Sequence, residues 1–331
     1  MKKQNKVISL IVSAFLLLAG FGEIISVNAE DVDENHSCTF ENLTITTNDG
    51  SALTYGTAVG DYDVYSNGKV LYINTNKAVT VTGTTTTATL AIAKGTKADV
   101  TFNNVSITNT AAAPVDVIAN NVSDPTTLHL TLADGSTNTL NAGTGPHAGI
   151  HVAYGAKLII DDSVKNWAEV EGGRIVDEYD DKGVQKPAWL MDSKNPGTLT
   201  VRGGYFSAGI GGQASASSTS AGQNSGAIVI NGGNIIASAP YANQNWSGGS
   251  GIGGSSYGGA GCHLDGGGII INGGNIDATA SYHGSGIGGG WHAGDIPGVG
   301  NKSTATGDIT INGGYVKATG KDHGNAFGGA C

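Results

Sequence analysis

The stretch GDITINGGYVKATG, residues 307–320, decides the fold because close copies of it stand earlier in the chain. Copies begin at Gly197 (GTLTVRGGYFSAG), Gly226 (GAIVINGGNIIAS) and Gly267 (GGIIINGGNIDAT), and the paired glycines of successive copies are 29, 41 and 40 residues apart. A second glycine cluster follows each copy, GIGG after the first three and AFGG after the last. Short motifs in a fixed order with spacers of variable length are typical of a solenoid, in which each repeat stacks on the next.

Apolar residues alternate with polar ones on both sides of the paired glycines. In the last copy, Ile309 and Ile311 precede the glycines, Val316 and Ala318 follow them, and Phe327 lies in the trailing cluster. Period-2 alternation predicts short β-strands with one apolar face each, and the glycines supply turns between them. The corresponding residues of the earlier copies are Leu199, Val201, Phe206, Ala208 and Ile210, then Ile228, Ile230, Ile235, Ala237 and Ile252, then Ile269, Ile271, Ile276, Ala278 and Ile287.

One rung of three such strands cannot bury its apolar residues alone, whereas rungs stacked ~4.8 Å apart form a continuous core. The equivalent positions of Asn231, Asn272 and Asn312 predict a ladder of side-chain amides along one turn. We therefore predict an all-β fold, a parallel β-helix with three short strands per rung. The rule for crossovers between parallel strands makes it right-handed.

The same pattern without paired glycines extends back to about residue 70, which predicts one solenoid over residues 70–331. In its earlier rungs APVDV, residues 113–117, and AGIHV, residues 148–152, take the place of GIGG. Residues 30–69 are predicted to be a β-rich segment that caps the first rung. Residues 161–196 interrupt the repeat, and DDKG between two apolar segments predicts an inserted hairpin. The chain stops in the third part of a rung, which predicts an uncapped or truncated C-terminus and further domains in a longer parent chain.

Residues 1–29 have the pattern of a secretory signal peptide. Lys2, Lys3 and Lys6 precede the apolar run VISLIVSAFLLLAGFG, and small residues before Glu30 supply a cleavage site. No later stretch is long and apolar enough to predict a transmembrane segment. The sequence therefore predicts a secreted, extracellular protein, either free or associated with the cell surface.

The composition narrows the choice of partners. The 331 residues include 54 glycines without a three-residue period, which excludes collagen, and the regular Ile and Val positions argue against disorder. Cleavage after residue 29 leaves 14 basic and 26 acidic residues, a net charge of −12. Because the sequence has no basic stripe, nucleic acid is not expected as a partner.

Aromatic and histidine residues are concentrated in the loops around the third strand of the later rungs. Flat aromatic faces beside hydrogen-bonding groups suit sugar rings, and stacked loops would form a groove for a chain-like ligand. The alternative for each residue is that it packs its loop onto the solenoid. His283 and His323 are expected to be neighbours, with His147 as a looser counterpart. The predicted ligand-binding residues are Tyr241, Trp246, Tyr257, Tyr282, His283, Trp291 and His292.

Catalytic and metal-binding residues are not predicted. Glycoside hydrolysis uses two carboxylates, and the close acidic groups of this chain, Asp61 with Asp63, Asp161 with Asp162 and residues 177–181, have nothing beside them that completes a site. The run DEYDDKG lacks the spacing of a calcium loop. No cofactor is expected, and calcium enters only as an ion that could bridge the acidic surface to a polyanion.

The segment LTLADGSTNTL…HAGIHVAYGAKLII, followed by repeats of ITINGGYVKATG…GSGIGGG, resembles secreted parallel β-helix repeat proteins of Firmicutes. This carbohydrate-binding-domain-containing class carries GIGGG-type repeats on a pectate-lyase-like fold. The resemblance covers roughly residues 70–331 and implies a polysaccharide, or a host or plant glycan, as partner. Relatives that bind polysaccharide with calcium carry an Asp-Gly-Ile-His-type pattern. Here HAGIH, with His147 and His151, stands in that place without the aspartate.

The sequence thus predicts a secreted or cell-surface protein that binds glycans without cleaving them. One alternative is an enzyme on the same scaffold, a glycoside hydrolase or polysaccharide lyase. The other is a protein-binding adhesin or host-interaction factor, in which Val229 and Ile270, expected to be neighbours on one outer face, belong to the contact surface.

Overall fold

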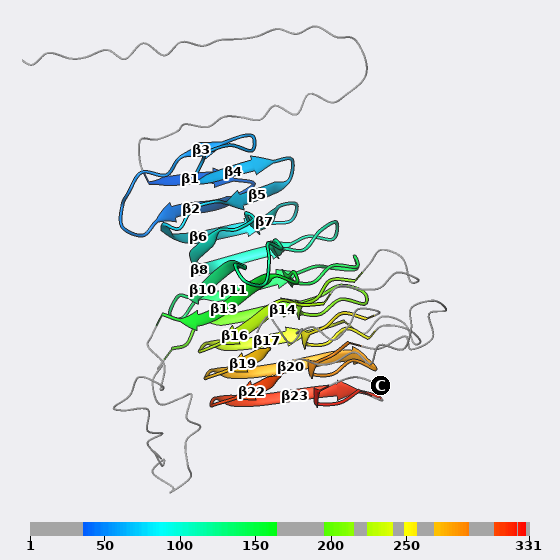
Figure 1. Cartoon of the computed structure of the whole chain (residues 1–331). Coiled ribbons are helices and arrows are strands. Elements are labelled where there is room, and N and C mark those ends of the chain that lie inside the picture. Colours follow the sequence, from blue (N-terminus) through cyan, green and yellow to red (C-terminus); the bar gives the residue numbers. More distant parts are fainter. Residues whose placement is uncertain are drawn as a thin grey trace, which may run out of the picture. The chain divides into compact units, whose positions relative to one another are not determined.

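The computed structural model describes residues 36–163, 195–214, 224–240, 248–256, 268–290, 308–322 and 324–328, all within one compact unit, Asp33–Cys331. Every regular element in these ranges is a β-strand, and the strands form a 14-stranded and a ten-stranded sheet (Figure 1). From β7 onward each strand of the described ranges pairs in parallel with its counterparts in neighbouring rungs. The predicted all-β parallel β-helix is confirmed.

Three faces make up the stack. Face one contains β2 (Leu43–Thr47), the first halves of β6 (Ala78–Thr85) and β8 (Lys97–Thr108), β10 (Thr126–Leu132), β13 (Ala156–Asp162), β16 (Ala227–Ile230), β19 (Ile269–Ile271) and β22 (Ile309–Ile311). Face two contains the second halves of β6 and β8, β11 (Thr137–Asn141), β14 (Thr198–Arg202), β17 (Asn234–Ser238), β20 (Asn275–Tyr282) and β23 (Tyr315–Lys321). Because β8 pairs with β10 through its first half and with β11 through its second, faces one and two form one bent sheet.

Face three is the ten-stranded sheet. It contains β3 (Tyr55–Gly56), β4 (Val64–Asn67), β5 (Val70–Ile73), β7 (Thr89–Ile92), β9 (Val115–Val117), β12 (Ile150–Val152), β15 (Ile210–Gly211), β18 (Ile252–Gly253), β21 (Ile287–Gly288) and β24 (Phe327–Gly328). The predicted equivalence of APVDV, AGIHV and the GIGG clusters is confirmed, because Val115, Ile150 and Ile210 are paired in register.

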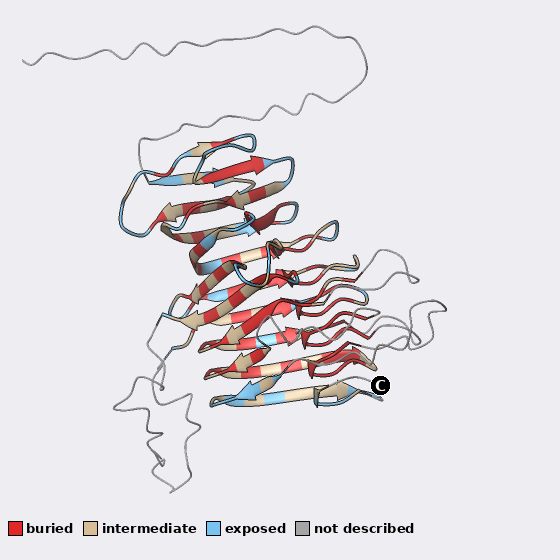
Figure 2. Ribbon diagram, in the orientation of Figure 1, coloured by how far each residue is buried: buried red, intermediate tan, exposed pale blue. Residues whose placement is uncertain are grey.

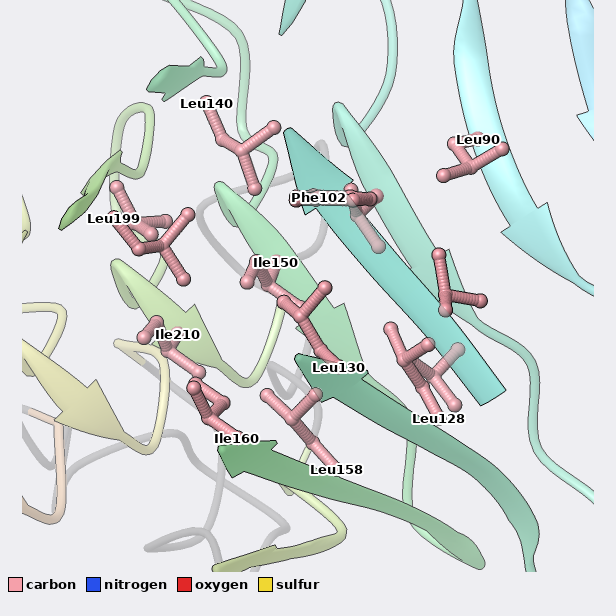
Figure 3. Packing of buried hydrophobic residues seen from close by; sticks show 14 of the residues in the cluster. Leu90, Phe102, Leu128, Leu130, Leu140, Ile150, Leu158, Ile160, Leu199 and Ile210 are labelled. Atoms are coloured by element: carbon pink, nitrogen blue, oxygen red, sulfur yellow. The ribbon is translucent and has the colours of Figure 1, made fainter. Parts of the chain in front are cut away.

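The core is built from columns of identical or similar side chains, one from each rung. On face one Leu130, Ile160, Ile230 and Ile271 are successive partners in register, and all four are fully buried. Figure 3 shows side chains of β10 and β13 together with Ile150 and Ile210 of face three inside the stack. In Figure 2 buried residues alternate with half-buried ones along the strands, as the period-2 pattern predicts.

One predicted equivalence is wrong. The copy beginning at Gly197 was matched with the copy at Gly226, which would place Leu199 beside Ile228. Instead β14 pairs with β17, and Leu199 lies beside Ile235 on face two. Phe206, predicted to lie in a strand, stands in a turn with φ +62°. Period-2 alternation is the same on adjacent faces, so the pattern could not tell a face-one strand from a face-two strand.

The segment predicted as the cap and the predicted hairpin are only partly within the described ranges. β1 (Ser37–Phe40) pairs antiparallel with β2, β2 with β6, and β4 with β5, so the first described strands differ from the later parallel rungs. Asp161 and Asp162, placed at the start of the hairpin, are the last residues of β13. The remainder of the hairpin, residues 164–194, lies outside the described residues.

The last described rung is far less buried than those above it (Figure 2). Phe327 stands in register with Ile287, as predicted, yet its side chain is 42% exposed, and Ile311 and Tyr315 are also exposed. Each strand of this rung pairs on one side only among the described strands. Its apolar side chains therefore lack a neighbour on one side.

The predicted asparagine ladder is present at the corner between faces one and two. The Asn272 side-chain amide donates to Asn231 Oδ1 at 2.8 Å, and that of Asn312 donates to Asn272 Oδ1 at 2.7 Å. Each ladder member also donates its backbone N–H to the preceding rung, as Asn272 does to Ile230 at 2.7 Å. The ladder gives the side-chain amides at this turn hydrogen-bond partners in the neighbouring rungs.

Asn272→Ala is expected to lower the free energy of unfolding by about 1–3 kcal/mol, because it removes one donor and one acceptor from the middle of the ladder. Asn312→Ala is the matched control. It removes one ladder bond at an exposed position, so its cost should be at most half as large. Denaturant unfolding of both variants checks the prediction, and equal costs would show that the ladder does not act as a connected array.

His129 lies between two carboxylates on the outer side of face one. Its Nε2 is 2.6 Å from Asp161 Oδ2 of the next rung, and its Nδ1 is 3.6 Å from Asp99 Oδ1 of the previous one. The hydrogen bond with Asp161 raises the pKa of His129 and outweighs the opposing effect of burial, and the charges of Asp161 and Asp99 raise the pKa further.

A raised pKa in the folded state means that the protonated form of His129 stabilises the fold. This stabilisation is fully present below the unfolded-state pKa of about 6.5 and is lost as pH rises through the folded-state pKa. We expect wild type to exceed His129→Gln in stability at about pH 5.5 and to match it at about pH 9. Because the ring is half-exposed, the difference should stay below ~1 kcal/mol. Unfolding titrations at both pH values measure it, and a difference that grows with pH would contradict the assignment.

Candidate functional site

The outward positions of face three change in character along the stack. Tyr65 of β4 pairs with Tyr72 of β5, and their rings stack with centroids 4.6 Å apart and planes 13° from parallel. The column continues through Ala91 to Asp116 of β9 and His151 of β12. From β15 onward it consists only of glycines, namely Gly211, Gly253, Gly288 and Gly328. Carboxylate and imidazole side chains in this column are therefore confined to β9 and β12.

The glycine part of the column is set by backbone geometry. Gly253 has φ +128°, and a Cβ added there would lie 2.0 Å from the carbonyl oxygen of Gly288 in the next rung. In the rungs of β15, β18 and β21 a backbone bond closes a five-residue arc around the inward isoleucine, as from Ser250 N to Gly254 O at 3.0 Å. Glycine adopts such a φ readily, whereas residues with a Cβ rarely do. Close stacking of the rungs therefore explains the GIGG clusters without a ligand.

Asp116 and His151 form a hydrogen-bonded pair across adjacent strands. Asp116 Oδ1 is 2.8 Å from His151 Nδ1, and the two residues are partners in register. The His151 side chain is 10% exposed, whereas that of Asp116 is 34% exposed and reaches solvent. The carboxylate favours the tautomer with the proton on Nδ1, which leaves a lone pair on Nε2. Nε2 is buried and has no hydrogen-bond partner.

His147 lies at the corner that leads into β12. Its carbonyl oxygen accepts the backbone N–H of Gly204 at 2.7 Å, which fixes the turn against the next rung. Burial lowers the pKa of His147, the hydrogen bond with the side chain of Gln213 opposes this effect, and a charge on His151 would lower the pKa further. The Nδ1 atom of His147 is buried and has no hydrogen-bond partner.

Two exposed tyrosines flank this pair of histidines. Tyr205 follows Gly204, whose N–H is bonded to His147, and its side chain is 39% exposed. Tyr154 follows β12 at the opposite end and is 41% exposed. The third-face site, as we name it, consists of Asp116, His147, His151, Tyr154, Tyr205 and Gln213.

Two of the seven predicted ligand residues lie within the described ranges. Tyr282 ends β20 and His283 follows it, both are half-buried, and their rings meet edge to face with centroids 4.0 Å apart. His283 has φ +60° and leads into β21 as His147 leads into β12. The other five, Tyr241, Trp246, Tyr257, Trp291 and His292, lie outside the described residues, as does His323.

Sequence reasoning missed most of the third-face site. Asp116, Tyr154, Tyr205 and Gln213 were not singled out, and His151 was noted only for its place in HAGIH. A signal was present, because the equivalence of APVDV with AGIHV places Asp116 beside His151. Tyr205 could not be placed while its segment was assigned to the wrong face.

Comparison of the chain with family models, with curated proteins and with solved structures finds no match in any of the three. Within the described ranges there is no group of three or more His, Cys, Asp or Glu residues arranged to hold a metal ion. The same ranges contain no helix with the length and apolar character needed to cross a membrane.

Proposed function

We propose that this is a secreted or cell-surface protein that binds a polysaccharide on face three and does not cleave it. The observation that carries the proposal is the placement of two exposed tyrosines at opposite ends of face three in adjacent rungs, Tyr154 after β12 and Tyr205 before β15, with the Asp116–His151 pair on the strands β9 and β12. The signal-like residues 1–29 and the resemblance of the repeats to glycan-binding β-helix proteins agree with it.

Sugar rings have an apolar C–H face and a polar rim. The exposed tyrosine rings offer flat apolar surface with a hydroxyl at the end, and the solvent-reaching carboxylate of Asp116 can accept hydrogen bonds from sugar hydroxyls. Stacked rungs repeat along one axis, so a site that spans neighbouring rungs suits an extended chain better than a compact small molecule.

The non-catalytic part of the proposal rests on the carboxylates. Glycoside hydrolases commonly place two of them about 5–9 Å apart across the scissile bond. In the outward column from Tyr65 to Gly328, Asp116 is the one carboxylate, and its Oδ1 is engaged by His151. The His151 Nε2 that such a pair would use as a general base is buried, and no second acid stands in that column.

A glycan array with the tag-free protein, with and without a calcium chelator, tests the proposal. Retained glycans are then incubated with the protein and assayed for reducing sugar. We expect retention of at least one polysaccharide class without product. Released sugar would establish a hydrolase or lyase, and an array without any retained glycan would remove the basis for glycan binding.

A further inference from the structure

We propose that His147 and His151 together bind one divalent transition-metal ion of the zinc class, with water completing the coordination. The proposal concerns the buried part of the third-face site and does not depend on glycan binding. It starts from two imidazole nitrogens, His147 Nδ1 and His151 Nε2, that are buried and have no hydrogen-bond partner.

Such atoms need an explanation because buried polar atoms are nearly always paired. A lone pair in a buried site without a partner costs about 1–3 kcal/mol relative to a satisfied one. Two such atoms occur within the five-residue segment 147–151 that leads into β12, on His147 and His151. A single occupant that accepts electron pairs from both nitrogens would remove both deficits.

The His151 ring is also held by its other nitrogen, because Asp116 Oδ1 is 2.8 Å from His151 Nδ1. Metal-binding histidines characteristically donate their second N–H to a carboxylate, carbonyl or water, which fixes the tautomer and the ring plane. His151 has this arrangement, with its lone pair on the buried Nε2.

The backbone holds the two rings on rigid elements. His151 is the middle residue of β12, between β9 and β15, and His147 is fixed through the bond from Gly204 N to its carbonyl. A site assembled from paired strands and a bonded turn is positioned before the ligand arrives, which lowers the cost of binding.

The donor set selects the metal. Two neutral imidazoles favour Zn²⁺, Cu²⁺ or Ni²⁺, whereas Ca²⁺ and Mg²⁺ prefer oxygen ligands. Asp116 serves as the outer partner of His151 and not as a ligand. Because no third protein ligand is arranged beside the pair in the described ranges, the affinity should be well below that of a closed four-ligand structural zinc site.

Isothermal titration of chelator-treated, tag-free protein with ZnCl₂ and with CaCl₂ tests the proposal. We expect one Zn²⁺ site in wild type with no matching Ca²⁺ site, and at least tenfold weaker Zn²⁺ binding in both His147→Gln and His151→Gln. His129→Gln is the matched control, since both ring nitrogens of His129 face carboxylates on face one. It should bind Zn²⁺ as wild type does.

A second measurement avoids variants that fail to fold. In wild type, addition of Zn²⁺ should shift the ¹⁵N resonances of His147 Nδ1 and His151 Nε2 and leave those of His129 in place. Absence of a Zn²⁺ site, or binding that is the same in all three variants, would overturn the proposal and assign a buried water to the two nitrogens. Glycan retention measured after chelation is a separate readout, so failure of one proposal is distinguishable from failure of the other.

Discussion

Gly253→Ala is expected to lower the free energy of unfolding by about 3 kcal/mol or more and to disrupt stacking of the rungs on both sides of β18. Gly253 has φ +128°, a conformation that L side chains rarely adopt, and its added Cβ would lie 2.0 Å from the Gly288 carbonyl oxygen. The obstacle is backbone of the next rung, so no side-chain rotation can relieve it. Because each rung contacts only its neighbours, the damage should be greatest in the two rungs that stack on β18.

Gly50→Ala provides the matched control for this prediction. Gly50 also has a positive φ, +72°, but a Cβ added there meets nothing within 4 Å. Its substitution should therefore cost only the conformational term of about 1–2 kcal/mol. Denaturant unfolding and hydrogen exchange of both variants separate the steric cost from the conformational one. Equal costs would mean that the rungs are not packed through the glycine column as described.

Tyr154→Ala and Tyr205→Ala are each expected to weaken binding of a glycan retained on the array by about tenfold, corresponding to ~1.4 kcal/mol. The tyrosine rings are exposed to about 40% and flank the Asp116–His151 pair, so truncation removes contact area for the sugar while the core stays intact. If the two rings act independently, the double variant should lose about a hundredfold.

Tyr315→Ala is the control for the tyrosine variants. Tyr315 is 52% exposed but begins β23 on face two, away from the third-face site. Its variant should bind as wild type does, and all three single variants should unfold within about 0.5 kcal/mol of wild type. Affinities come from titration with the identified oligosaccharide. Loss of affinity in Tyr315→Ala with none in the other two would move the site to face two.

Much of the fold could be predicted because its core residues are also its repeat. The alternation around Ile228 and Ile230, and the equivalent Asn231 and Asn272, specify strands, inward positions and one corner directly. Because equivalent residues of successive repeats stack on one another, the sequence repeat alone gives the register between neighbouring strands. The error at Leu199 arose because the strand before the paired glycines of that copy, β14, lies on face two, whereas in the later copies that strand lies on face one.

The candidate site was less predictable because it does not repeat. Asp116 and His151 occupy positions that are glycine in every later rung, and Tyr154 and Tyr205 stand in turns of single rungs. A search for recurring residues passes over such positions. The charge and burial of an outward residue depend on which strand lies beside it. For Asp116 and His151, the pairing of β9 with β12 decides this.

Hydroxyl-radical footprinting of the tyrosines, with and without an oligosaccharide from the array, tests the central claim most directly. The account predicts that a saturating oligosaccharide protects Tyr154 and Tyr205, which are exposed beside the Asp116–His151 pair, and leaves the modification of Tyr315 unchanged. Protection of Tyr315 without protection of Tyr154 and Tyr205 would contradict glycan binding on face three.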